Sequence, residues 1–567
     1  MVQAGTLTTR ADGSVALVGQ FSGLNTEALV EATILAQRLP AVSLERQISQ
    51  DKLESTALGE LNTILNNLRN SANKLRNEPG FSAAQNNTFQ QRSAFLTSST
   101  STTASSVLGL SVDAGTPTGT YQIEVLQTAK ANKLSSGAVA NASSAQNVTD
   151  TLTIGLSGGT TANISITPDL TLDQIASAIN AEQSNTKVRA SVLKISDTES
   201  RLILTAEETG KDIQLSGSSG EFLTTFGSGG SLETVQTADK ARIRVDGIST
   251  VIERDSNDIN DVISGVKIQL FKEDPGNTIT LEVGQNLGGI RTEIESFVAS
   301  YNALREFYDA QRNFDPNDSN ATQPALYSSS ILRDALSSVS GILGTGPQGI
   351  TSGNIATLRE VGITLNQESR LVIDSAELED ALVNNPQQLE NLFSFTFESS
   401  DPNLRVLSRS QAVFPDDFEI TIDGVDSSGN ITGASVTGLG NVFDISGKVL
   451  TGKAGTAFEG LSLFYGGEDG SGSNTITVQN SVGVAEQFFN TLEDFVAPGT
   501  GRISERVLQI EEVNSDRTDQ IAAIDARLAL TRQFLIDRYA RLEQALAQAD
   551  ASRRQLEAFA NASNNNN

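Results

Sequence analysis

The hydrophobic residues of the C-terminal stretch from Arg502 to Ala560 recur at alternating spacings of four and three residues. A repeat of 3.5 residues gathers them into a narrow seam along an α-helix, which a partner helix must cover. Neither Pro nor Gly interrupts the stretch, so it predicts a single rod about 90 Å long. The apolar seam comprises Ile503, Val507, Ile510, Ile521, Ile524, Leu528, Leu535 and Leu542, and it is broken by Asn514, Arg517 and Arg538.

The N-terminal stretch from Asn25 to Glu78 carries a second seam with the same spacing. Its apolar members are Leu58, Leu61, Leu65, Leu68, Ala72 and Leu75, and toward the N-terminus it weakens at Asp51 and Gln47. An earlier apolar set, which includes Ala28, Leu35 and Leu39, precedes Pro40. Because proline lacks the backbone N–H that a helix interior needs, we expect Pro40 to end or kink a helix.

Two terminal rods in one chain favour antiparallel pairing, with the intervening chain carried as a head. The broken seams predict a loose shaft that also associates with copies of itself. The alternative interpretation is that both rods are core helices of a large helical domain.

Between the rods the chain is rich in Ser, Thr and Gly, and its apolar residues alternate as in β-strands. One short helix is expected from Leu172 to Asn180, capped by Thr171 with Gln174 at the capping-box position. Helical periodicity returns after Gly289, and strand patterns return from Val406 to Val482. The order of helix, β, helix, β and helix predicts an α+β multidomain fold, in which a terminal α-helical coiled-coil stalk carries inserted antiparallel β-rich head modules.

The same changes of pattern set the expected domains. They are a disordered tail (1–22), an N-terminal helical leg (23–80), a β-rich head domain (81–135 with 237–286), an inserted outer β-rich domain (136–236), a helical leg segment (287–403), an additional β-rich module (404–482), the C-terminal coiled-coil helix (483–560) and a disordered tail (561–567).

Charge is distributed unevenly along the chain. The net formal charge is −28, yet 25–78 holds six Lys and Arg against seven Asp and Glu, and 502–560 holds nine Arg against ten acidic residues. About −26 therefore lies outside the rods. Nearly neutral rods associate side by side more readily than acidic domains, and the overall charge argues against nucleic acid and anionic membranes as partners. No stretch is apolar enough to insert in a membrane, and 1–20 lacks the apolar block of a cleaved signal peptide.

The composition also limits the chemistry. With no Cys, His or Trp, the chain offers no thiol nucleophile, conventional zinc site or Ser-His-Asp triad. The string Gly344-Thr345-Gly346-Pro347-Gln348-Gly349 follows a helical pattern instead of a strand, so it is not expected to bind phosphate. The acidic turns at 423–430 and 468–474 lack the spacing of a calcium loop. The sequence therefore predicts no catalytic, cofactor or metal site, and no enzyme.

Several motifs in order along the chain resemble one family, that of the bacterial flagellar filament cap, also called hook-associated protein 2. The matching motifs are Phe21-Ser22-Gly23-Leu24-Asn25-Thr26, Gly119-Thr120-Tyr121-Gln122-Ile123-Glu124-Val125, Arg201-Leu202-Ile203-Leu204-Thr205, Val245-Asp246-Gly247, Gly362-Ile363-Thr364, Asn385-Pro386 and Leu392-Phe393. The stretch 404–482 matches the family least.

The resemblance implies an extracellular structural protein at the tip of the flagellum, exported by the flagellar type III apparatus without a cleaved signal. It implies a homo-oligomeric ring of about five copies under which flagellin folds and inserts without being lost. The implied partners are flagellin, other hook-associated proteins and an export chaperone. Three alternatives remain: an adhesin that binds surfaces through its acidic head, a flagellin-like filament or junction subunit, and a carboxylate enzyme.

Overall fold

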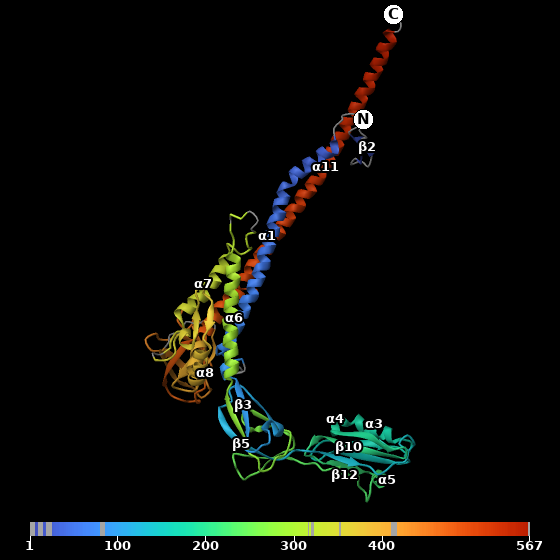
Figure 1. Ribbon diagram of the computed structural model, residues 1–567, viewed down its shortest axis with the longest axis vertical. Coiled ribbons are helices and arrows are strands. Elements are labelled where there is room, and N and C mark those ends of the chain that lie inside the picture. The colour runs from blue at the N-terminus through green and yellow to red at the C-terminus, as the bar shows by residue number, and fades with distance from the viewer. Residues whose placement is uncertain are drawn as a thin grey trace. The chain divides into compact units, whose positions relative to one another are not determined.

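The computed structural model describes residues 6–9, 15–18, 25–79, 86–315, 317–318, 322–350, 353–409 and 417–564. The chain forms two compact units (Figure 1). The helical unit comprises Met1–Arg76 with Ile294–Asn567, and the β unit comprises Asn77–Glu293.

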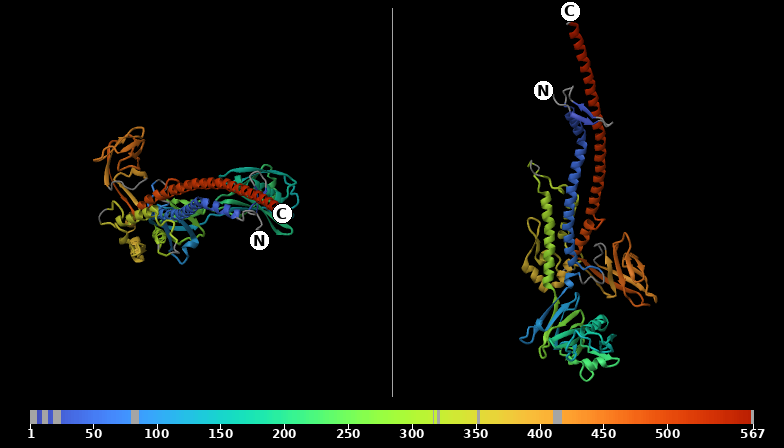
Figure 2. Two further views of the ribbon diagram at one scale, coloured as in Figure 1. Left: turned by 90° about the horizontal axis from the view of Figure 1, so that it is seen from above. Right: turned by 90° about the vertical axis from the view of Figure 1, so that its right-hand side faces the viewer.

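Two long helices dominate the helical unit. Helix α1 (Thr26–Leu75) and helix α11 (Arg502–Asn564) run antiparallel and side by side, and the C-terminal part of α11 continues past the start of α1 (Figures 1 and 2). Asn25 caps α1, because its side chain accepts a hydrogen bond from the Ala28 N–H. Both rods expected from the sequence are therefore present as helices.

The expected end of a helix at Pro40 is wrong, because α1 continues through this residue. Proline removes only one backbone hydrogen bond, and other contacts hold the helix on both sides. Arg38 forms an ion pair with Glu45 across the proline, at 2.7 Å, and a second one with Asp525 of α11, at 2.9 Å.

Shorter helices complete the helical unit at the end of α1 remote from its N-terminus. They are α6 (Leu287–Arg312, of which the part from Ile294 belongs to this unit), α7 (Ser330–Thr345), α8 (Ser375–Asn384), α9 (Pro386–Phe393) and α10 (Val484–Val496), with the hairpin of β18 (Ile363–Leu365) and β19 (Leu371–Ile373). Phe297 is buried at their centre, with its ring edge-on to Phe488 at 4.9 Å and to Phe393 at 6.2 Å. These aromatic contacts join α6, α9 and α10 in one core.

Between α9 and α10 the chain forms a β-sandwich. One sheet has the order β20-β27-β22-β23 and the other has the order β21-β26-β25-β24. The strands are β20 (Phe395–Ser399), β21 (Leu404–Arg409), β22 (Asp417–Val425), β23 (Ile431–Val436), β24 (Phe443–Ser446), β25 (Val449–Gly452), β26 (Leu461–Tyr465) and β27 (Asn474–Val482). Its core contains Phe418, Phe443 and Phe458. The sandwich starts at Phe395 and not at 404, because β20 pairs with β27.

The β unit contains two modules, each with its own core. The inner module has the sheets β14-β13-β5-β17-β3 and β15-β16-β4. Its strands are β3 (Arg92–Ser98), β4 (Leu108–Val112), β5 (Gly119–Gln127), β13 (Ala241–Val245), β14 (Ile252–Arg254), β15 (Asp258–Ile263), β16 (Val266–Leu270) and β17 (Ile279–Gln285), with the short helices η2 (Thr88–Gln90) and α2 (Ala104–Val107).

The outer module has the sheets β12-β6-β10-β9 and β11-β7-β8. Its elements are β6 (Ala131–Ser135), β7 (Asp150–Leu156), β8 (Thr161–Ile166), α3 (Leu172–Ala181), α4 (Gln183–Thr186), β9 (Val188–Ser196), β10 (Glu199–Thr209), β11 (Ile213–Gly217), α5 (Glu221–Phe226) and β12 (Glu233–Gln236). The capping box of Thr171 and Gln174 is confirmed. Because β6 belongs to the outer sheet, this module begins at Ala131 and not at 136.

The predicted tails contain some ordered structure. Strands β1 (Thr6–Thr9) and β2 (Val15–Val18) pair antiparallel within the range expected to be disordered. The rest of 1–22, and with it the start of the Phe21–Thr26 motif, lies outside the described residues. Helix α11 extends to Asn564, so it enters the predicted C-terminal tail.

Candidate assembly site on the helical hairpin

The seam of α1 is buried, but it contacts two different partners. Leu58, Leu61, Leu65, Leu68 and Leu75 are fully buried. Ion pairs set the antiparallel register, since Arg506 meets Glu54 and each later residue of α1 lies opposite an earlier residue of α11. Leu61 therefore lies close to the level at which α11 begins. The following turns of α1 pack against α10, so the rod at the C-terminus does not cover the whole predicted seam.

The seam of α11 is covered in part. Ile503, Ile510 and Leu528 are buried, whereas Val507, Ile521, Ile524 and Leu535 are half-buried. Leu542 is 43% exposed. The participation of these seam residues in contacts between copies stays a prediction.

Polar residues in the middle of the seam pair across the hairpin. Asp51 forms an ion pair with Arg517, and Glu31 forms one with Arg532. The remaining pairs are Glu54 with Arg506, at 2.8 Å, and Arg38 with Asp525, at 2.9 Å. The hydrogen bond from Arg38 holds the pKa of the Asp525 carboxyl below its ordinary value. Asp51 and Arg517, which each interrupt a seam as a hydrophobic surface, therefore pair with each other across the two helices.

A double-mutant cycle tests this role at Asp51 and Arg517. We expect the Asp51→Ala and Arg517→Ala variants to show a coupling free energy of about 0.5–1 kcal/mol in urea unfolding, decreasing with added salt. The charge swap Asp51→Arg with Arg517→Asp should restore most of the stability. Arg527 lies about 15 Å farther along α11, so an Asp51/Arg527 cycle should show no coupling. Equal coupling in both cycles would contradict a specific pair.

The hairpin also exposes a second apolar stripe. On α1, Leu35, Leu39, Val42 and Leu53 keep one heptad phase, with Arg46 and Ser49 at the intervening positions, and they are 37–65% exposed. On α11, Leu508, Val513, Leu530 and Phe534 are 44–75% exposed. The sequence pattern before Pro40 indicated Leu35 and Leu39, but not the continuation of the phase through Val42 to Leu53. We call the set Leu35, Leu39, Val42 and Leu53 the α1 stripe.

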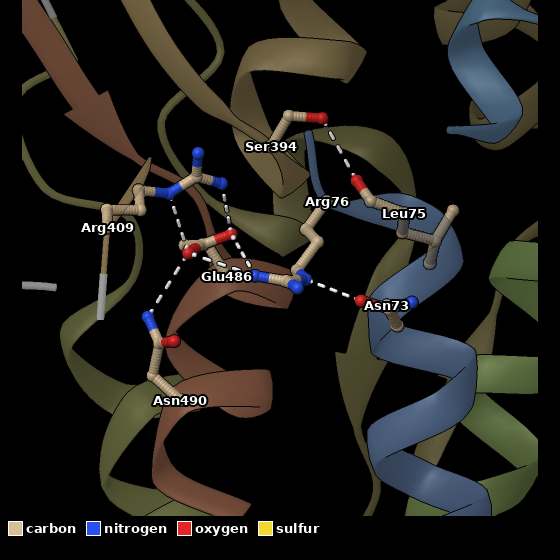
Figure 3. Close-up of polar contacts among 7 residues, drawn as sticks. All are labelled: Asn73, Leu75, Arg76, Ser394, Arg409, Glu486 and Asn490. Atoms are coloured by element: carbon tan, nitrogen blue, oxygen red, sulfur yellow. Dashed lines mark hydrogen bonds and ion pairs between the residues drawn. The ribbon is translucent and has the colours of Figure 1, made fainter. Parts of the chain in front are cut away.

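A buried ion cluster joins the base of the hairpin to the β-sandwich (Figure 3). Glu486 of α10 is 1% exposed and pairs with Arg409 of β21, at 2.8 Å, and with Arg76 after α1, at 3.4 Å. Asn490 donates a further hydrogen bond to the Glu486 carboxylate. The guanidinium groups also lie over aromatic rings, Arg76 over Phe489 and Arg409 over Phe395. No local pattern in the sequence indicates this cluster, because Arg76 and Glu486 are 410 residues apart.

The ion cluster controls the ionisation of Glu486. Burial raises the pKa of its carboxyl, but the positive charges of Arg409 and Arg76 and the hydrogen bonds to the carboxylate outweigh burial, so the net shift is downward. Ser394 adds a neutral contact beside the cluster, donating a hydrogen bond to the Leu75 carbonyl at 2.9 Å. The site holds separate segments of the chain together.

The described residues contain no group of three or more His, Cys, Asp or Glu side chains placed to hold a metal ion. Within the same residues, no helix is both long enough and apolar enough to cross a membrane. Gly346 forms the C-cap of α7, which is not the strand-to-helix turn of a phosphate-binding loop. The exposed stripes of the hairpin are therefore the leading candidate for function.

Family models match most of the chain in the expected order. The N-terminal model of flagellar hook-associated protein 2 matches residues 22–132, the flagellin hook IN motif matches 151–208, and the C-terminal model of flagellar hook-associated protein 2 matches 238–551. The chain belongs to the flagellar hook-associated protein 2 family. This is the family of the flagellar filament cap, so the protein is a structural component of the flagellar tip.

Relatives of this family share about a quarter of their residues with the chain. The A-type flagellar hook-associated protein 2 of Pseudomonas aeruginosa is 27% identical over 409 residues, which cover 67% of this chain and 80% of the relative. The flagellar hook-associated protein 2 of Aeromonas caviae is 23% identical over 393 residues, which cover 67% of this chain and 81% of the relative. Among solved structures, the flagellar cap protein FliD of Escherichia coli is 24% identical, with a TM-score of 0.47 and coverage of 59% and 89%. FliD of Pseudomonas aeruginosa PAO1 is 28% identical, with a TM-score of 0.32 and coverage of 36% and 96%.

Proposed function

We propose that the protein caps the distal end of the flagellar filament as a homo-oligomeric ring, and that its helical hairpin is the leg that engages the filament end. The observation that carries this proposal is the α1 stripe, which keeps a heptad phase yet remains exposed in a single chain. A second heptad seam on a helix that already has one partner indicates a further helical partner. Exposed apolar residues that share one face of a helix are candidates for an interaction site.

Charge supports the hairpin as the place of assembly. Residues 25–78 and 502–560 each carry about −1, whereas the rest of the chain carries about −26. Copies that approach through their hairpins therefore avoid the repulsion that their acidic domains would cause. Individually weak contacts between copies would also suit a cap, because each contact has to yield when a new flagellin subunit is inserted.

The proposal also covers the number of copies, the neighbouring proteins and the route of export. We include about five copies in a closed ring, flagellin and other hook-associated proteins as neighbours, an export chaperone, and export without a cleaved signal peptide. The absence of Cys supports export as an unfolded chain, since no disulfide can form before folding at the tip. Family membership does not favour an adhesin or a filament or junction subunit.

Immunogold labelling of intact flagella tests where the protein acts. In cells that lack the gene and carry it on a plasmid, we expect label at filament tips only. Label along the whole filament would contradict the cap.

The contribution of the α1 stripe needs its own variants. The triple variant Leu35→Gln/Leu39→Gln/Val42→Gln should lose tip label and give short filaments, because the apolar contacts to the next helix are removed. Its unfolding free energy should change by less than about 0.5 kcal/mol per site, since these side chains are exposed. The matched control is Leu365→Gln/Leu439→Gln, which alters exposed leucines of the same unit outside the hairpin. Normal filament growth with the stripe variant would contradict the role of the stripe.

A further inference from the structure

The four-stranded sheet of the outer module ends in two open edges. Its order is β12-β6-β10-β9, so β9 and β12 are the edge strands. Among the described residues, β9 pairs in this sheet only with β10, and β12 only with β6. Open edges present unpaired N–H and C=O groups and readily accept another strand.

Hydrogen bonds at Ala190 show which backbone groups of β9 face outward. The side chain of Asn180 accepts a hydrogen bond from the Ala190 N–H, at 2.7 Å, and donates one to the Ala190 carbonyl, at 2.9 Å. This amide therefore occupies the edge at Ala190 in place of a neighbouring strand. Because the groups of an antiparallel strand alternate, the N–H and C=O of Val192 and Lys194 point the same way. Asn180 therefore covers one end of the β9 edge, and the backbone groups of Val192 and Lys194 form the rest of it.

The side chains along both edges are more apolar than exposed edges usually are. Leu193 and Ile195 of β9 are each 53% exposed, and Val235 of β12 is 59% exposed. Glu233, Thr234 and Val235 are all exposed, so β12 is uncovered on both faces. Surfaces of this kind are normally protected by pairing.

The charges on the two edges are complementary. Strand β9 carries Arg189 and Lys194 and no acidic residue, although Lys194 also contacts Asp197 in the following turn at 2.9 Å. Strand β12 carries Glu233, which is 67% exposed while pairing with Arg201. Two β9 edges would bring like charges together, whereas β9 and β12 attract.

Strand directions decide how copies would join. Adjacent strands of this sheet are all antiparallel, so β9 and β12 run in opposite directions. Copies in the same orientation would therefore place β9 of one beside an antiparallel β12 of the next. This contact is head-to-tail, and it can repeat around a ring.

We propose that β9 of one copy pairs antiparallel with β12 of the next copy, so that the outer modules of the oligomer share continuous sheets. This inference rests on the proposed ring and adds a specific contact to it. The contact is distinct from the hairpin stripes, because it uses backbone hydrogen bonds of the β unit.

Crosslinking tests the contact in the full-length protein, which contains no native Cys to interfere. Ser191→Cys marks β9 and Thr234→Cys marks β12, and a flexible bismaleimide joins thiols that lie close together. The double variant should give a ladder of dimers, trimers and higher multimers, while each single variant stays monomeric on a denaturing gel. Efficient dimers from Ser191→Cys alone would overturn the proposal in favour of β9 pairing with itself. Absence of a ladder from the double variant would overturn it as well.

A proline variant separates strand pairing from mere proximity. Lys194→Pro, added to the double variant, removes an outward N–H and should reduce the ladder about tenfold compared with Lys194→Ala, which loses the same charge but keeps the N–H. Equal ladders from both variants would overturn strand pairing. Light scattering on the same samples distinguishes failure of the edge contact from failure of the proposed ring. A multimer without a ladder overturns the edge contact alone, whereas a monomer at every concentration contradicts the ring as well.

Discussion

The Glu486→Gln variant is expected to lower the free energy of unfolding of the helical unit by about 3–5 kcal/mol. The Arg409 and Arg76 side chains are only 3% and 8% exposed, and glutamine would remove the negative charge that both of them contact. Removing one partner of a buried ion cluster costs more than the cluster contributes, because the remaining charges stay desolvated. Urea unfolding followed by far-ultraviolet circular dichroism measures the change.

The pH dependence of stability should change in the same variant. Because the folded pKa of Glu486 lies below its ordinary value of 4.5, the group adds stability above that value and loses it as the pH falls through the lower folded pKa. The native protein should therefore lose stability progressively below about pH 4.5. Glu486→Gln should lack this contribution, so the difference between the two proteins should shrink on acidification. A difference independent of pH would contradict the ionised state of Glu486.

Glu493→Gln provides the matched control on the same helix. Glu493 pairs with Arg69 of α1 at 2.5 Å, but its side chain is 39% exposed and that of Arg69 is 24% exposed. Water compensates much of the lost charge, so the cost should stay below about 1 kcal/mol. If both variants lowered the free energy of unfolding equally, burial of the Glu486 cluster would not increase the cost of removing its charge.

Much of the fold follows from local patterns. The heptad spacing of 502–560 predicted a helix that the structure shows as α11, and Thr171 with Gln174 predicted the start of α3. These features depend on residues within a few positions of one another. The continuity of α1 through Pro40 does not follow from a local pattern, because proline inside a helical stretch predicts an end or a kink.

The partners of buried faces could not be predicted from periodicity. A heptad pattern shows that one face of α1 needs a cover, but it does not identify the cover. The short helix α10 competes with α11 for that face, and the register of the hairpin decides where each one binds. The Glu486 cluster was missed for the same reason, since Arg76 and Glu486 are 410 residues apart.

The sequence showed that charged residues interrupt the two hydrophobic seams, but not that these residues pair with each other. Asp51 and Arg517 each interrupt a hydrophobic row, and only the antiparallel register shows that the two interruptions meet. The α1 stripe was obscured by Arg46 and Ser49, which occupy its middle positions. In both cases the missing information was the relative position of the two helices.

Replacing Leu61, Leu65 and Leu68 with Gln is expected to unfold the helical unit, and thereby to abolish oligomers and filament growth. The three side chains are fully buried. Truncating a buried leucine to alanine costs about 2–5 kcal/mol, and burying an amide without partners adds to that cost. Three such changes exceed the stability of about 5–15 kcal/mol that is typical of a domain. Circular dichroism should show a large loss of helix.

The β unit should remain folded in this triple variant. Its two cores contain residues only from the range 77–293, so they do not depend on α1. Limited proteolysis should therefore degrade the helical unit and leave a resistant fragment that corresponds to the β unit. Leu542→Gln is the control, because Leu542 belongs to the same predicted set of seam residues but is 43% exposed, and its cost should be below about 0.5 kcal/mol. A triple variant that keeps its helix but loses oligomers would show that these leucines act between copies and not within one chain.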